Sequence, residues 1–67
     1  MSIQSIILKQ MELYLNGKHA KHIANVHVYM QNPAGIGEHS DVMEAIEDEL
    51  GKAVDAKDKL ELLRLKF

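Results

Sequence analysis

The sequence contains no cysteine and no tryptophan, a single proline, and only three aromatic residues, Tyr14, Tyr29 and Phe67. Without cysteine the chain can form neither a disulfide nor a zinc site with thiolate ligands. No apolar run approaches the roughly 18 residues that a membrane-spanning helix needs. The N-terminal apolar run at residues 6–8 ends at Lys9, so no signal peptide is predicted. These absences favour a cytoplasmic protein that does not contact a membrane.

The small size of the chain, 67 residues, limits the core that one copy can build. A domain of this size buries about 60% of the surface that its unfolded chain exposes. Small folds therefore usually add disulfides, a metal or a partner subunit. The hydrophobic share is 46% and largely aliphatic. We expect a single domain over residues 1–67 that forms homo-oligomers, with a dimer favoured, and that binds no cofactor.

The spacing of apolar residues predicts an all-α fold of three or four short helices. The first covers about residues 4–15, with Ser2 or Ser5 as its N-cap. Asn16 and Gly17 are expected to end it, because both tolerate the left-handed conformation found at helix ends. Its predicted buried stripe is Ile3, Ile7, Met11, Tyr14 and Leu15.

Residues 18–31 fit either a helix or a strand. A helix is predicted because the segment runs 14 residues without glycine or proline, longer than a typical strand. A solitary strand would also leave its edges unpaired. However, apolar and polar residues alternate strictly over 24–30. The alternative is therefore an α+β fold, in which a strand at about 24–30 pairs with 62–67 or with another subunit.

A turn is predicted at residues 32–40, between a basic N-terminal half and an acidic, helical C-terminal half. Pro33 disfavours a helical conformation in the residue before it. Gly35 and Gly37 allow backbone angles that are closed to other residues. The net charge is +2 before the turn and −4 from the turn to the C-terminus.

After the turn, Ser40 or Asp41 is predicted to cap the next helix. With Asp41 as the cap, Glu44 takes the third helical position, as in a capping box. Gly51 weakens this helix by about 1 kcal/mol relative to alanine, so the helix is expected to end there or near Val54. Its predicted buried face is Val42, Ile46, Leu50 and Ala53. Its predicted solvated side is Glu44, Glu47, Asp48 and Glu49.

A last short helix is predicted to begin at Asp55 or Asp58 and to carry Leu60, Leu63 and Phe67 on one side. The four leucines between residues 60 and 65 leave few polar positions. This tail is therefore expected to be buried.

The candidates for metal binding are His19 and His22, three residues apart on a predicted helix. Lys18 and Lys21 flank them with unfavourable positive charge, so we expect solvated histidines and no metal. Further ligands would be His27, Glu38 and His39. The acidic residues follow one helix face instead of lining a cleft, so no enzymatic activity is expected.

Binding is the remaining class of function, and we expect a small interaction or accessory protein that acts through protein–protein contacts and self-association. Nucleic-acid binding is the alternative, although three lysines neutralise only a few phosphates. Its candidate contacts are Lys9, Lys18, His19, Lys21 and His22. Glu38 and His39 form a candidate polar site in the central turn, because they are more polar than a turn requires.

The run at residues 25–41, NVHVYMQNPAGIGEHSD, resembles small uncharacterised proteins of T4-like marine phages. The similarity extends through Glu44-Ala45-Ile46 and includes residues 58–61, DKLE. The resemblance implies a phage or marine origin and the cytoplasm of an infected bacterium. It implies no activity and no residue roles.

Overall fold

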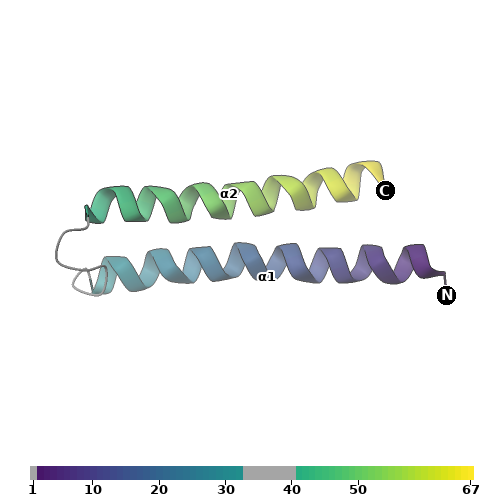
Figure 1. The fold of residues 1–67 in the computed structure, drawn as a ribbon, viewed down its shortest axis with the longest axis horizontal. Helices are drawn as coiled ribbons and strands as arrows, with labels where there is room; N and C mark the ends of the chain where they lie inside the picture. The colour runs from purple at the N-terminus through teal and green to yellow at the C-terminus, as the bar shows by residue number, and fades with distance from the viewer. Residues whose placement is uncertain (1, 33–40) are drawn as a thin grey trace.

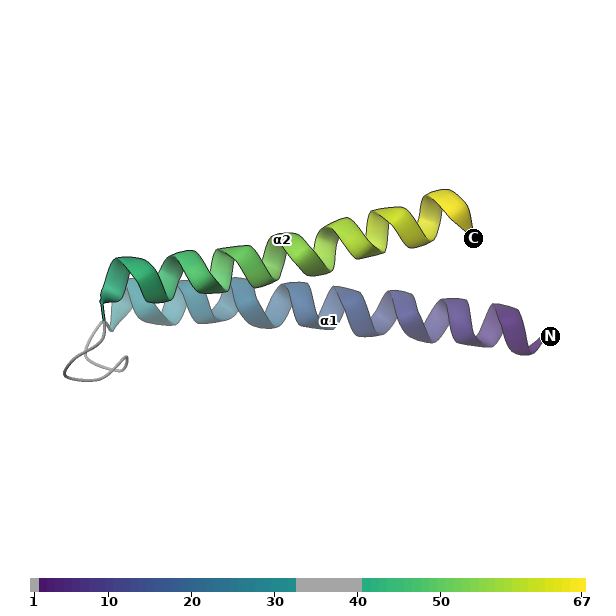
Figure 2. The same cartoon turned by 45° about the horizontal axis from the view of Figure 1, so that its top comes forward.

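The computed structural model describes residues 2–32 and 41–67, which form a helical hairpin. Helices α1 (Ile3–Gln31) and α2 (Val42–Lys66) lie side by side and run in opposite directions, with both termini at the same end (Figure 1). The view turned by 45° shows the same arrangement (Figure 2). The molecule is a rod, with extents of 50 × 17 × 16 Å.

The prediction of an all-α fold is confirmed, whereas the prediction of three or four short helices is wrong. The described residues contain two long helices and no strand. Residues 18–31 are helical, so the α+β alternative with a strand at 24–30 is also wrong. Of the turn predicted at 32–40, Asn32 is the C-cap of α1 and the other residues lie outside the described ones.

Both glycines that were predicted to end helices lie inside them. α1 continues through Asn16 and Gly17, and α2 continues through Gly51 and past Asp55 and Asp58. One glycine costs a helix about 1 kcal/mol relative to alanine. Because the residues on both sides of each glycine pack against the other helix, this local cost does not stop the helix.

The predicted N-caps are confirmed at both helices. The Ser2 hydroxyl oxygen accepts a hydrogen bond from the Ser5 backbone N–H at 3.1 Å. The Asp41 carboxylate accepts one from the Glu44 backbone N–H at 3.2 Å. Each such cap satisfies a backbone donor that the helix leaves free. The local signals therefore place the starts of both observed helices correctly, whereas the start predicted at Asp55 or Asp58 is wrong, because α2 passes through both residues.

The two helices meet along a seam with the alternating spacing of four and three residues that is typical of coiled coils. On α1 the seam consists of Leu8, Glu12, Leu15, His19, His22, Val26 and Tyr29. On α2 it consists of Val42, Ile46, Glu49, Ala53, Ala56, Leu60 and Leu63. All of these residues are buried or half-buried. The alternation keeps the seam of each helix turned toward the other along the rod.

The predicted buried faces largely agree with the seam in α2 and disagree with it in α1. Val42, Ile46 and Ala53, together with Leu60 and Leu63 of the predicted tail, are buried or half-buried in the seam, as predicted. Of the stripe predicted for the first helix, only Leu15 is buried, and Tyr14 is 58% exposed. On α2, Leu50 is 44% exposed, whereas Glu49, which was predicted to be solvated, is buried. The tail predicted to be buried exposes Leu62, Leu65 and Phe67. The reason in α1 is that apolar residues occupy two opposite sides, so periodicity alone does not show which side faces α2.

Candidate interaction surface

A buried polar contact joins the middle of the two helices. The Nδ1 atom of His22 lies 2.5 Å from the Oε2 atom of Glu49, and the Asn25 amide donates to the same oxygen at 3.2 Å. His22 is 7% exposed and Glu49 is 8% exposed. Among the described residues, every buried side-chain nitrogen or oxygen has a hydrogen-bond partner. The buried polar atoms of His22 and Glu49 are therefore paired within the chain.

The environment of Glu49 favours its charged form. Burial raises the pKa of its carboxyl, but hydrogen bonds with His22 and Asn25 and the charges of His22 and Lys52 outweigh burial. The net result is a pKa below the ordinary value. Glu49 is therefore a carboxylate at neutral pH, held by partners from α1.

The histidines that were considered as metal ligands belong to the helix–helix contact. His19 is half-buried, and its Nδ1 atom lies 3.1 Å from the backbone carbonyl oxygen of Ala53. The expectation of solvated histidines is wrong for His22. Within residues 2–32 and 41–67, no three histidine, aspartate or glutamate side chains come together in a way that could hold a metal ion.

Sequence reasoning missed the contact between His22 and Glu49. The signal that could have found it is the spacing of the seam, because continuing the alternation of four and three through Gly17 places His22 on the same side as Leu15. The prediction that the first helix ends at Gly17 separated Leu15 from His22, so the two residues were not recognised as lying on the same side of one helix.

The lysines proposed for nucleic-acid contact do not share one side of α1. The Lys18 ammonium lies 5.6 Å from the centre of the Tyr14 ring, a cation–π distance. By the seam spacing, Lys9 and Lys18 lie on opposite flanks of α1 and Lys21 lies on its outer side. With His19 and His22 in the seam, the five residues form no single patch. Glu38 and His39 lie outside the described residues.

The side of α1 that points away from α2 is mostly apolar, and we call it the outer face of α1. By heptad position, its apolar and small members are Ile3, Ile6, Ile7, Leu13, Tyr14, Gly17, Ala20, Ala24 and Val28. Its polar members are Gln10, Lys21, His27 and Gln31. Ile7, Leu13 and Val28 are each more than half exposed. Contiguous exposed apolar surface of this kind marks interaction sites.

The corresponding side of α2, the outer face of α2, has the opposite character. Its members are Glu44, Glu47, Asp48, Gly51, Val54, Asp55, Asp58, Glu61, Leu62 and Leu65. It carries six acidic residues and no basic one, whereas the outer face of α1 carries one formal charge, Lys21. Carboxylates at this density require water. The two helices therefore differ: α2 is amphipathic, and α1 has two apolar sides.

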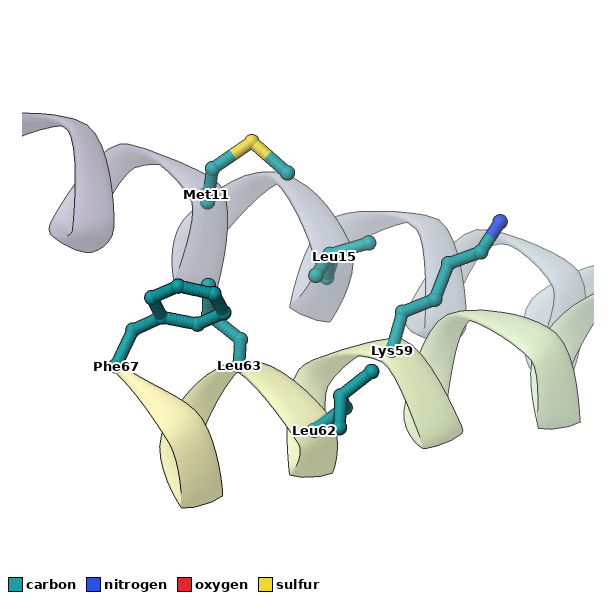
Figure 3. Close-up of a pocket in the computed structure, with 6 residues that line it drawn as sticks. All are labelled: Met11, Leu15, Lys59, Leu62, Leu63 and Phe67. Carbon is teal, nitrogen blue, oxygen red and sulfur yellow. The ribbon is translucent and has the colours of Figure 1, made fainter.

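An apolar groove at the end that holds both termini extends this surface. Figure 3 shows the six residues that line it, Met11, Leu15, Lys59, Leu62, Leu63 and Phe67. Its volume is about 200 Å³. An adjacent hollow also contains Phe67, together with Ile3 and Ile7 of the outer face of α1. The exposed apolar surface is therefore continuous from the outer face to the groove.

Gly17 lies in the middle of the outer face of α1, at the floor of a shallow hollow. Leu13, Tyr14 and Lys21 are among the residues that surround it. A Cβ atom added at Gly17 would meet no atom within 4 Å. No contact within the chain therefore requires a glycine here, although it costs the helix about 1 kcal/mol relative to alanine.

The chain matches no protein-family model, no curated protein and no solved structure. The resemblance to marine phage proteins, with the origin and location that it implies, therefore stays a prediction. Neither of the two described helices has a stretch long and apolar enough to span a bilayer.

Proposed function

We propose that this protein is a non-enzymatic interaction module that acts through protein–protein contacts made by the outer face of α1. The observation that carries the proposal is the pair of apolar sides on α1. An exposed helix side that carries large apolar residues is typical of an interaction site. α2 covers only the seam side of α1, and the opposite side of α1 remains exposed. Because this exposed side carries large apolar side chains, it is suited to packing against the surface of a protein partner.

Covering the outer face of α1 contributes favourable free energy to association. Fully burying a large apolar side chain contributes about 1.5–3 kcal/mol. Ile7, Leu13, Tyr14 and Val28 are each between 54% and 58% exposed. Covering these four side chains therefore contributes several kcal/mol, part of which offsets the loss of translational and rotational freedom on binding.

A photo-crosslinking residue placed on each outer face tests the proposal in cells that produce the protein. Tyr14→benzoylphenylalanine probes the outer face of α1, and Val54→benzoylphenylalanine probes that of α2. The two positions are matched controls because the native side chains are 58% and 57% exposed.

We expect discrete protein adducts, either with a second copy or with another protein, from position 14 and not from position 54. Adding Leu13→Glu to the position-14 variant should abolish them, because it places a charge in the apolar face. Absence of adducts from position 14, or the same adducts from both positions, would refute the proposal.

A further inference from the structure

The groove at the end that holds both termini is apolar on both of its walls. One wall comes from α1 and the other from α2 (Figure 3), and together they consist of Met11, Leu15, Leu62, Leu63 and Phe67. The exposed fractions of Met11, Leu62 and Phe67 are 38%, 55% and 74%. A third helix that lies along the groove would cover apolar side chains of both walls at once.

The shape of this site favours a helix over a lipid surface. A helix that binds a bilayer lies in the plane of the interface and buries an outward, convex face. The groove is instead a depression of about 200 Å³ between two helices. The adjacent hollow, which shares Phe67, adds about 470 Å³ at the same end of the molecule. Side chains that project from one face of an amphipathic helix fill depressions of this kind.

The flank of the hairpin that holds the groove carries charge of one sign. At the positions next to the seam on this side, the charged residues are Lys18 of α1 and Lys52, Lys59 and Lys66 of α2. In coiled coils such positions commonly pair with opposite charges and set the choice of partner. Here both helices present lysine, so neither helix supplies a carboxylate to the other from these positions.

Two of these lysines stand together at one end of the groove. Lys59 lines the groove at the end opposite Phe67 (Figure 3). A hydrogen bond from Lys59 and the charges of Lys59 and Lys18 lower the pKa of the Asp55 carboxyl, so one lysine from each helix acts on this carboxylate. Lys66 follows Lys59 by one heptad, about 10 Å along the axis, and extends the row of lysines toward Phe67.

Asp55 leaves part of this positive charge uncompensated. Its carboxylate lies 2.8 Å from the Lys59 ammonium, and both side chains are 58% exposed. An exposed pair of this kind contributes little to stability, and an ammonium group has three hydrogen-bond donors. Lys59 can therefore also bind a carboxylate of a partner. With Lys18 and Lys66 included, these residues give the rim of the groove a formal charge of +2.

We infer that the partner of this interaction module is an amphipathic helix of another protein, whose apolar stripe fills the groove and whose flanking carboxylates pair with Lys18, Lys59 and Lys66. This inference rests on the proposed function and names the chemistry of the partner. The hollow at Phe67 joins the groove to Ile3 and Ile7 of the outer face of α1, so one partner can contact both surfaces.

Two synthetic helical peptides of three heptads each test this chemistry against the full chain. Both carry leucine at the two apolar positions of each heptad. One carries glutamate and the other carries lysine at the flanking positions. Fluorescence anisotropy of the labelled peptides measures binding. We expect the glutamate peptide to bind about tenfold or more tightly than the lysine peptide at about 50 mM salt, and the difference to shrink at about 0.5 M because salt screens exposed charges.

Matched variants locate the binding surface. Lys59→Gln combined with Lys66→Gln should weaken binding of the glutamate peptide about tenfold, or about threefold for each exposed ion pair lost. Lys57→Gln combined with Arg64→Gln removes the same charge from the opposite flank of α2 and should change the affinity less than about twofold.

The apolar wall has its own pair of variants. Leu62→Gln places a polar group in the groove and should weaken binding about tenfold. Leu65→Gln, at a residue that is 78% exposed on the outer face of α2, should not. Circular dichroism verifies that each variant keeps its helix content.

Equal affinity for the two peptides, binding of neither peptide, or equal losses from the two double lysine and arginine variants would overturn the inference. Binding to vesicles of phosphatidylcholine and phosphatidylglycerol without binding of either peptide would assign the surface to a lipid. Sedimentation as a dimer without binding of either peptide would assign it to a second copy. Both of these results also overturn the inference.

The crosslinking experiment separates this inference from the proposed function. If neither peptide binds but position 14 still forms protein adducts in cells, the acidic helix is refuted as the partner and the proposed function stands. If position 14 forms no adducts either, both are refuted.

Discussion

Removing the Glu49 carboxylate should destabilise the hairpin far more than the same change at an exposed position of α2. Glu49→Ala leaves the His22 ring nitrogen without its partner at a site where His22 is only 7% exposed. An unsatisfied buried polar group costs about 1–3 kcal/mol. Asn25 also loses an acceptor, but it is only half-buried and can turn to water. We expect a loss of about 2 kcal/mol in the free energy of unfolding.

Glu47→Ala is the matched control, because Glu47 is exposed on the same helix. Both substitutions change helix propensity in the same way, so their difference isolates the contact with His22. Surface substitutions of this kind usually stay within about 0.5 kcal/mol. A double variant, His22→Leu with Glu49→Leu, should be at least as stable as the unmodified protein, because apolar replacement of a buried pair is commonly neutral or stabilising.

Urea denaturation followed by circular dichroism measures these differences. Protein concentration is held fixed, so that mass action contributes equally to all variants. For a small chain, with a slope of about 1 kcal/mol per molar urea, a loss of 2 kcal/mol moves the midpoint by about 2 M. Equal midpoints for Glu49→Ala and Glu47→Ala, or a double variant less stable than Glu49→Ala, would contradict a stabilising contact between Glu49 and His22.

Three further predictions concern caps, packing and pH. Asp41→Ala should cost about 1 kcal/mol through loss of the N-cap, measured by urea denaturation against Asp41→Asn, which should keep most of the stability. Leu60→Ala, in the buried seam, should cost about 2–3 kcal/mol, whereas Leu65→Ala, at a residue that is 78% exposed, should leave the midpoint nearly unchanged. The lowered pKa of Glu49 contributes stability that is present above the unfolded value of about 4.5 and lost as pH falls through the folded value. The difference in melting temperature between the unmodified protein and Glu49→Gln should therefore shrink on acidification below that pH; a constant difference would contradict the assignment.

The candidate surface was only partly predictable from the sequence. The spacing of apolar residues predicts the stripe with Ile3, Ile7, Met11 and Tyr14 but places it in the core of the chain. Its exposure became visible only when α2 was found on the other side of α1. The contact between His22 and Glu49 joins residues 27 positions apart, and no local pattern predicts such a pair without knowledge of how the helices are aligned.

The sequence by itself determined that most of the chain is helical and that Ser2 and Asp41 cap helices. Apolar spacing and the capping residues Ser2 and Asp41 act within a few residues, so their effect can be read locally. Tertiary structure decided that α1 passes through Gly17 and that α2 passes through Gly51. The physical reason is that the two free energies differ in size. One glycine destabilises its helix by about 1 kcal/mol, whereas packing of the seam residues stabilises both helices over their full length. The same long-range packing chose which of the two apolar sides of α1 faces α2 and left the other side exposed.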